Sequence, residues 1–299
     1  MNLVLASIYE LDPAVVEPFF RSLRQTGYDD AVVAVVMNIS PACRTLLHRY
    51  RVTIVDMEYR GLPLTYASLS TRLRHAPRAI WGAYCQPRGR RRDPSRLLVN
   101  SWRYVCYRDY LAALAEKPQF ILMADVRDVV FQSNPFAYPF PAGLSVASEC
   151  VRSSIGGSRG NAKWLWEVAG IRELRRLSSR TPICSGTTVG DYATIQQYLE
   201  LMTTHLRRKF FWGMFDAIDQ GLHNYFVHNQ MVAPLQIYTN WNGPFLTLDS
   251  EVVSSAQKDQ TGFLCNQDGS VVPIVHQYDR IKNLYPPGEP RPECWQHIP

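Results

Sequence analysis

The chain has 299 residues, of which 46% are hydrophobic and 19% are charged, and its formal net charge is +6. This length allows one large α/β domain or two ordinary domains, and the composition excludes disordered, collagen-like and low-complexity proteins. The region from Arg72 to Arg108 holds ten arginines and a single acid, so the positive charge is concentrated in one segment. That segment is compatible with an anionic partner such as a phosphate, a phospholipid or RNA.

The seven cysteines are widely scattered, and none belongs to a CxxC pair. This usage favours reduced thiols over a disulfide framework. The first residues lack the basic and apolar stretches of a signal peptide, and no apolar run reaches the length of about 18 residues that a membrane helix requires. We therefore expect a soluble, cytoplasmic protein.

Apolar runs rich in β-branched residues alternate with helical patterns from the start of the chain. The first helix is expected to begin at Asp12-Pro13, with Asp as the N-cap and Pro in the first turn. The predicted order is a strand at 3–8, this helix, a strand at 31–37, a helix at 41–51 and a strand at 52–57. Such a βαβαβ order predicts a parallel sheet with right-handed crossovers.

Residues 60–98 interrupt this rhythm with prolines, glycines and most of the arginines, which indicates an inserted segment or loop. A helix is predicted over 100–117, capped at Asn100-Ser101, and the apolar strand 120–124 then runs directly into Asp125. Further strands are predicted at 144–148, near 235 and at 271–275, and further helices at 161–169, 191–208 and 215–227. We expect one domain over 1–299, ending in an irregular tail at 285–299.

Two acids, Asp125 and Asp128, follow the strand at 120–124. Open α/β sheets bind ligands at the carboxyl edge of their parallel strands. Two carboxylates there suit a divalent cation, which can in turn hold a diphosphate. In the alternative interpretation Asp125 caps the next turn and pairs with Arg127, while Asp128 is solvated.

The segment Asp125-Val-Arg-Asp128-Val-Val-Phe131 resembles the signature of metal-dependent nucleotide-sugar glycosyltransferases of the GT-A fold. Their signature is an apolar strand, then Asp-x-Asp, two apolar residues and often Phe; this chain has one additional residue between the acids. Alignment on the Asp-Val-Val-Phe side makes Asp128 the direct metal ligand. Asp125 is then a second ligand, or lies near the ribose or a metal-bound water.

Three later segments are similar to elements of family 8 and related glycosyltransferases. Cys184–Gly190 resembles the small-residue segment that lines the acceptor side, and Asp219-Gln220 with Asn224 resembles an Asp-Gln-x-x-x-Asn helix start. His276 and Lys282 match a His-x5-Lys element without its internal glycine. The resemblance implies that His276 completes the metal site and that Lys282 contacts the diphosphate.

The resemblance implies an α/β GT-A-like fold, in which a mostly parallel, Rossmann-type sheet is flanked by helices. It implies transfer of a sugar from a nucleotide-diphosphate donor to a hydroxyl of a glycan or lipid-linked acceptor, in surface glycan or polysaccharide synthesis. Mn²⁺, or Mg²⁺, would be the cofactor, and Arg280 or Lys282 would stabilise the leaving diphosphate.

The stereochemical course has two interpretations. Similarity to family 8 implies retention, with Asp219 or Gln220 beside the anomeric carbon. An inverting enzyme would need a carboxylate base, and Asp191 and Asp216 are the candidates. Helix capping is the structural alternative for Asp191 and Asp219.

Other residues are weaker candidates for contacts with a ligand. Tyr9, at the end of the first strand, would stack on the nucleotide base or pack in the core. Arg103 or Arg108 would contact a phosphate or the nucleotide. Trp241, in a turn with Asn242 and Gly243, is the best candidate for a platform on which a sugar stacks.

The Arg-rich segment has three interpretations: a solvated loop, a phosphate-binding lid, or a patch that contacts an anionic membrane. It lacks the interleaved aromatic residues of single-strand nucleic-acid binders, so no nucleic-acid partner is expected. For the whole chain, the alternatives are another metal-dependent nucleotide-handling enzyme, such as a nucleotidyltransferase, or a non-catalytic relative that binds a sugar nucleotide or glycan.

Overall fold

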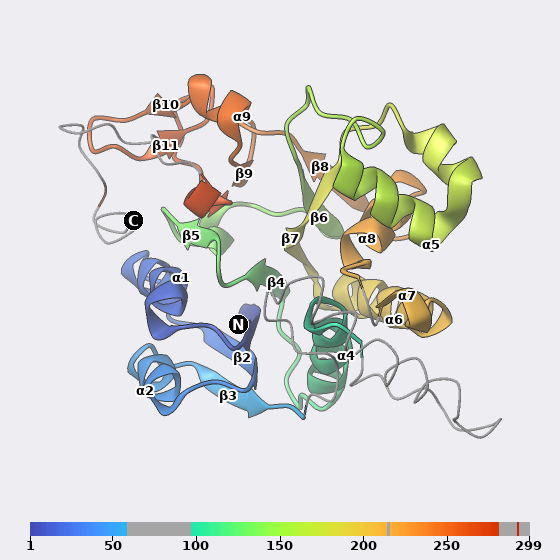
Figure 1. Ribbon diagram of the computed structural model, residues 1–299. Helices are drawn as coiled ribbons and strands as arrows, with labels where there is room; N and C mark the ends of the chain where they lie inside the picture. Colours follow the sequence, from blue (N-terminus) through green and yellow to red (C-terminus); the bar gives the residue numbers. More distant parts are fainter. Residues whose placement is uncertain (59–96, 214–215, 281–291, 293–299) are drawn as a thin grey trace.

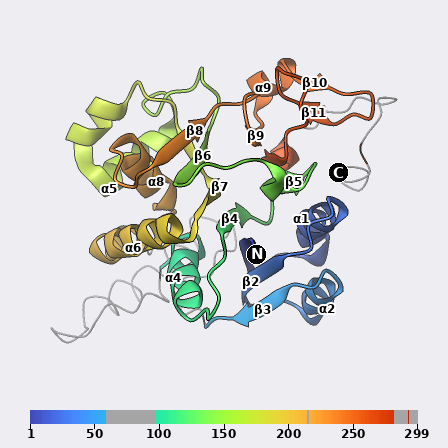
Figure 2. The same ribbon diagram turned by 180° about the vertical axis from the view of Figure 1, so that it is seen from behind.

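A computed structural model describes residues 1–58, 97–213, 216–280 and 292. A seven-stranded sheet in the order β3-β2-β1-β4-β7-β6-β8 forms its centre, with helices on both faces (Figure 1; Figure 2). In chain order its strands are β1 (Leu3–Tyr9), β2 (Ala31–Met37), β3 (Thr53–Asp56), β4 (Phe120–Asp125), β6 (Leu144–Ser148), β7 (Ile183–Asp191) and β8 (Leu235–Tyr238). The mostly parallel α/β architecture expected from the sequence is confirmed.

Helices fill the connections between the strands of this sheet. Those that precede β7 are α1 (Pro13–Gln25), α2 (Pro41–Arg49), α4 (Val99–Ala112) and α5 (Arg159–Leu177). Those that follow it are α6 (Tyr192–Arg208), α7 (Phe210–Gly213), α8 (Asp219–His228) and α9 (Ser250–Ser254). Short 3-10 turns occur at Pro135–Ala137 and Tyr278–Arg280.

The first two helices begin where their capping residues predict. Asp12 accepts a hydrogen bond from the Ala14 amide at the start of α1, and Ser40 accepts one from the Cys43 amide at the start of α2. In each helix a proline occupies the first turn, where it forfeits no helical hydrogen bond. Local sequence signals therefore fix this part of the chain.

The helix predicted over 100–117 has different ends in the structure. It begins at Val99, its N-cap Leu98 makes no side-chain capping bond, and it ends at Ala112. Most of its residues from Val99 to Tyr107 are buried, so packing rather than capping fixes its position. The helix predicted at 161–169 is also longer and kinks at Gly170, whose φ is 84°.

Strand β7 was not predicted, and it reverses the direction of the sheet. It pairs antiparallel with β4 on one side and with β6 on the other. Its sequence contains Ser, Thr and Gly residues instead of an apolar run, which is why a strand pattern is not visible. Because β7 runs against β4, its first residues lie at the edge where β4 ends: Thr187 pairs with Ala124.

The two faces of the sheet pack against separate cores, as the alternation along β1 shows. Leu3 and Leu5 point into a core formed with α4, α5, α6 and α8. Val4, Ala6 and Ile8 point into a core formed with α1 and α2. This period of two is the expected pattern for a strand covered on both faces.

A second, three-stranded sheet has the order β5-β12-β9, with β5 (Val129–Phe131), β9 (Phe245–Thr247) and β12 (Ile274–His276). Only this short β12 forms from the strand predicted at 271–275. A two-stranded ribbon, β10 (Gln257–Lys258) with β11 (Leu264–Cys265), lies beside it at the top of Figure 1. Since β5 follows β4 after a three-residue turn, this small sheet begins at the carboxyl edge of the large one.

Several predictions fall on residues outside the described ranges: positions 60–96 of the Arg-rich segment, Lys282, and the tail at 285–299 apart from residue 292. Of the seven cysteines, the five in the described ranges are all buried. Within residues 1–58, 97–213 and 216–280, no helix combines the length and apolar character needed to cross a bilayer.

Candidate metal and donor site

Two acids and a histidine meet where the two sheets join. Asp125 is the last residue of β4 and lies opposite Ser7 of β1, at the carboxyl edge of the parallel strands. A turn carries the chain to Asp128, whose backbone carbonyl accepts a hydrogen bond of 2.6 Å from the Gln277 amide. Asp128 is thereby fixed beside the end of β12.

His276 reaches the two acids from the other end of the sequence. It is the last residue of β12 and pairs with Val129, the residue after Asp128. Its Nε2 lies 3.4 Å from Oδ1 of Asp128, and one ligand atom from each of Asp125, Asp128 and His276 lies within 4.8 Å of the others. The structure thus brings together the three residues proposed as metal ligands.

The other nitrogen of His276 faces a thiol. Nδ1 lies 3.2 Å from Sγ of Cys184, which also accepts a hydrogen bond of 3.3 Å from the Gly186 amide. Burial disfavours the imidazolium, but Cys184 and Asp128 outweigh it and raise the pKa of His276 well above its usual value. A partner on one ring nitrogen fixes the orientation of the other, as at many metal sites.

Gly186 on β7 keeps space open between these ligands. A Cβ atom at this position would lie 2.6 Å from Nε2 of His276 and 2.9 Å from Oδ2 of Asp125. At such short distances His276 or Asp125 would have to shift, so any side chain at this position would displace the ligands. Carboxylate oxygens and an imidazole nitrogen around such a space fit a cation of the Mn²⁺ type.

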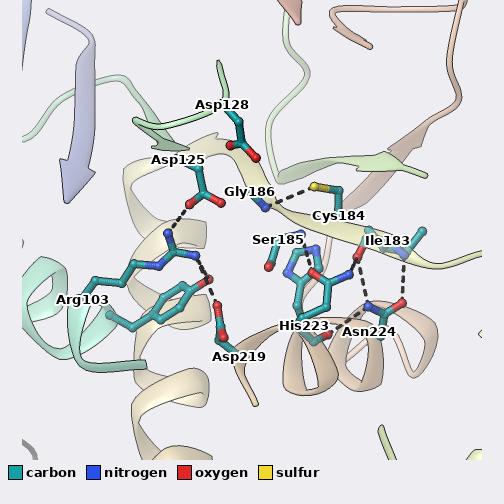
Figure 3. A network of polar contacts seen from close by, with 12 residues as sticks. Arg103, Asp125, Asp128, Ile183, Cys184, Ser185, Gly186, Asp219, His223 and Asn224 are labelled. Carbon is teal, nitrogen blue, oxygen red and sulfur yellow. Dashed lines mark hydrogen bonds and ion pairs between the residues drawn. The ribbon is translucent and has the colours of Figure 1, made fainter. Parts of the chain in front are cut away.

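Arg103 of α4 links the acids of two elements (Figure 3). Its guanidinium donates to the carboxylate of Asp125 and, at 3.2 Å, to that of Asp219 at the start of α8. Burial lowers the pKa of Arg103, but its contacts with Asp125, Tyr104 and Asp219 raise it well above the usual value. Arg103 therefore stays charged and joins α4, β4 and α8 at the edge of the site.

The carboxyl group of Asp219 is buried, with 3% of the residue exposed. Desolvation outweighs the attraction of Arg103 and raises its pKa to about 6. A carboxyl group with such a pKa takes up or releases a proton near neutral pH, which is a common property of functional sites.

Gln220 and Asn224 attach α8 to the first residues of β7. Gln220 accepts from the Ser185 amide at 2.9 Å and donates to the Ile183 carbonyl at 2.9 Å. Asn224 accepts from the Ile183 amide at 2.8 Å and donates to the same carbonyl at 3.0 Å. The Asp-Gln-x-x-x-Asn element thus places Asp219 beside Arg103 and fixes α8 against the first residues of β7.

The two predicted inverting bases, Asp191 and Asp216, are engaged in other contacts. Asp191 pairs with Phe120, the first residue of β4, so it lies at the opposite edge, about 17 Å away by strand rise. It caps α6 and accepts hydrogen bonds from the amides of Thr194 and Gly143. Asp216 binds Lys163 and, at 2.9 Å, the indole nitrogen of Trp164.

Of the residues predicted to contact the nucleotide or its phosphates, some lie near the edge of the site and others have partners elsewhere. Tyr9 ends β1, at the same edge as Asp125, and packs partly buried against a core. Arg108 lies on α4 and pairs with Asp109 and Thr203. The backbone of Arg280 belongs to the 3-10 turn directly after β12, which brings it near His276; its side chain and Lys282 are outside the description.

Sequence reasoning missed the two residues of β7 that shape the cluster. The sequence resemblance places Cys184 and Gly186 only in a segment that lines the acceptor side. Their roles depend on β7 running antiparallel to β4, and the small residues of β7 do not predict a strand. The one signal in the sequence is the glycine of the Cys-Ser-Gly triplet, because a glycine often marks a close approach of the backbone to another group.

No known protein family matches the sequence, and no curated protein matches it. Solved structures do resemble the fold. The galactosyltransferase LgtC, in complex with donor and acceptor sugar analogues, has a TM-score of 0.51 at 11% identity, covering 99% of this chain and 92% of LgtC. An active-site mutant of LgtC has a TM-score of 0.51 at 10% identity, with complete coverage of both chains. The described residues have the GT-A fold of these glycosyltransferases.

Proposed function

We propose that the chain is a metal-dependent glycosyltransferase that transfers a sugar from a nucleoside-diphosphate donor to a hydroxyl acceptor. The observation that carries the proposal is the convergence of Asp125, Asp128 and His276 at the carboxyl edge of a GT-A sheet. These residues would hold Mn²⁺, or Mg²⁺ through the carboxylates. When bound, the cation would neutralise charge on the diphosphate leaving group.

Asp128 and His276 are proposed as direct ligands because they already face each other at 3.4 Å. The two carboxylate oxygens of Asp125 have different surroundings. Oδ1 accepts a hydrogen bond from Arg103, while Oδ2 faces the space beside Gly186. Arg103 therefore orients Asp125 toward the cation or the donor ribose. This is a positioning role, in which a hydrogen bond to one oxygen fixes the direction of the other.

Asp219 is proposed to border the donor sugar, because Arg103 connects it directly to Asp125. Gln220 adjoins it, but its amide already bonds the backbone of β7. We therefore assign contact with the sugar to Asp219 and positioning of β7 to Gln220. Retention is the proposed course, because Asp191 caps α6 beside the start of β4 and Asp216 already bonds Lys163 and Trp164.

The turn after β12 is proposed to meet the diphosphate through Arg280 and Lys282, as the family 8 resemblance implies. Tyr9 is proposed to border the nucleotide, since it ends β1 at the same edge. The acceptor is proposed to be a glycan or lipid-linked saccharide in surface polysaccharide synthesis. The Arg-rich segment is proposed to hold the enzyme at anionic lipid or phosphate.

The direct test measures thermal unfolding and slow donor hydrolysis with Mn²⁺ and a panel of nucleoside-diphosphate sugars. We expect one donor to stabilise the protein and to release a nucleoside diphosphate and free sugar. Asp128→Asn should abolish both effects, whereas Asp29→Asn, an exposed acid in the turn before β2, should change neither. Failure of every sugar nucleotide to bind would refute the proposal.

The same assay separates the alternatives. Donor binding without hydrolysis, and without transfer to any saccharide, would identify a non-catalytic sugar-nucleotide-binding protein. Release of pyrophosphate from a nucleoside triphosphate would identify a nucleotidyltransferase.

A further inference from the structure

A second concave site lies apart from the metal cluster, between the segment that joins β8 to β9 and the turn that follows β11. Its volume is about 270 Å³. An indole, a phenol, three amide side chains and a carboxylate line it: Trp241, Tyr138, Asn242, Asn266, Gln267 and Asp268. We call it the Trp241 hollow.

The Trp241 hollow and the metal cluster share no residue. Thr247, at the end of β9, pairs with His276, whereas Trp241 and Gly243 precede the start of the same strand. The turn folds back on β9, because the side chain of Asn240 accepts from the amide of Thr247 at 2.8 Å and donates to its carbonyl at 3.1 Å. The hollow is therefore a neighbouring site with its own lining.

The backbone of the hollow is held rigidly. Trp241 has φ of 67°, a left-handed conformation that is costly for a bulky residue. Its carbonyl accepts a hydrogen bond of 3.0 Å from the Gln267 amide. The buried Asn266 side chain bonds both the amide and the carbonyl of Gly243, at 3.2 and 3.0 Å. Backbone strain retained by such contacts is typical of ligand-binding positions.

The chemistry of the lining selects a class of ligand. Among its described residues there is no cationic side chain, and Asp268 would repel a phosphate. The side chains of Asn242, Gln267 and Asp268 are exposed and offer donors and acceptors in several directions. An aromatic face beside planar amides and one carboxylate suits a neutral polyhydroxylated ring, whose C–H face packs on the indole while its hydroxyls bond the rim.

We propose that the Trp241 hollow is a saccharide subsite that binds a neutral sugar unit outside the transfer site. The identity of this sugar rests on the proposed function. It would belong to the acceptor or to the lengthened product, and it would be bound while another part of the same glycan occupies the donor edge. Two weak contacts on one glycan raise its effective affinity without any new contact at the reacting centre.

The test follows fluorine NMR resonances of fluorotryptophan-labelled full-length protein during titration with lactose, maltose and cellobiose. Trp241→Gly identifies the resonance, and glycine tolerates the left-handed backbone at this position. We expect one disaccharide to shift the Trp241 resonance saturably while the exposed Trp166 of α5 stays unchanged. Trp241→Gly should weaken binding, measured by calorimetry, by about tenfold or more. Trp166→Ala is the matched control.

A second variant keeps the test valid if Trp241→Gly unfolds. Gln267→Ala removes an exposed amide of the hollow and keeps the backbone bond to Trp241, so it should weaken binding and leave the melting temperature unchanged. Absence of any saturable shift at millimolar sugar, or equal shifts at Trp241 and Trp166, would overturn the subsite. Because no donor or metal is added, its failure is distinguishable from failure of the proposed transferase, which donor hydrolysis reports.

Discussion

On one side of β4 the strands run parallel and are almost wholly apolar, whereas on the other side β7 runs antiparallel and carries small and polar residues. The parallel side supplies a frame and one acid, Asp125. The antiparallel side supplies Cys184 and Gly186 on β7 and, through α8, the buried Asp219. We call these two sides the parallel half and the antiparallel half. The site forms at β4, where the two halves meet.

Arg103 is the strongest link between the two halves, so its removal should have the largest effect. Arg103→Leu leaves the buried Asp219 without its cation, which we expect to cost about 3–5 kcal/mol of unfolding free energy. Urea denaturation measures this loss. Arg108→Leu is the control on the same helix: this residue is more exposed and pairs at the surface, so about 0–1 kcal/mol is expected. Equal losses for both variants would show that Arg103 does not join the halves.

Gly186 tests whether the antiparallel side shapes the metal cluster. Gly186→Ala places a Cβ against Nε2 of His276, and overpacking of about 1–3 kcal/mol should weaken Mn²⁺ binding about 10- to 100-fold. Calorimetric titration measures the affinity. Ser185→Ala is the neighbouring control, because it keeps the backbone amide that donates a hydrogen bond to Gln220. Unchanged affinity in Gly186→Ala would remove β7 from the metal site.

His223 tests how the buried polar groups of the second half respond to acid. Desolvation lowers its pKa to about 3, from 6.5 when exposed. Between these values the unfolded chain binds a proton that the folded chain excludes, so stability falls as pH drops below about 6.5, by up to ~1.4 kcal/mol per pH unit.

His223→Gln should remove this contribution, and urea denaturation at several pH values would show a shallower fall in stability. The matched control is His48→Gln, since His48 is exposed on α2 in the parallel half. If the slope of stability against pH is the same in the wild type and in His223→Gln, the imidazole is not held neutral by burial.

Asp191 should have the smallest effect, on stability alone. Partial burial opposes ionisation, but the amides of Thr194 and Gly143 hold its pKa below the usual value. Asp191→Ala should cost about 1–2 kcal/mol, as loss of an N-cap does, while Asp191→Ser restores most of it. Donor hydrolysis should be unaffected by either change; a selective loss of hydrolysis would return Asp191 to the catalytic candidates.

The parallel half could be predicted because its signals are local. Asp12 and Ser40 cap helices, and the apolar runs of β1, β2 and β4 are continuous. The edge position of Asp125 then follows from the topology alone. Here sequence periodicity and tertiary structure agree, and the predicted strands differ from the observed ones only at their ends.

The antiparallel half could not be predicted in the same way. β7 lacks a hydrophobic pattern, because Gly186 must leave space and Cys184 must face His276. α4 has no side-chain cap, and burial of most of its residues fixes its position instead, so its start has no local signal. The meeting of Arg103 with Asp219 joins residues 116 positions apart, and nothing in either local sequence indicates the contact.

Pulsed electron paramagnetic resonance of the Mn²⁺-loaded protein tests the metal cluster most directly. We expect one Mn²⁺ per chain, coupled to one histidine nitrogen, and loss of this coupling in His276→Gln while His228→Gln on α8 retains it. Asp128→Asn should lower occupancy. A nitrogen coupling that persists in His276→Gln, or the absence of saturable Mn²⁺ binding to the wild type, would contradict a metal site formed by Asp125, Asp128 and His276.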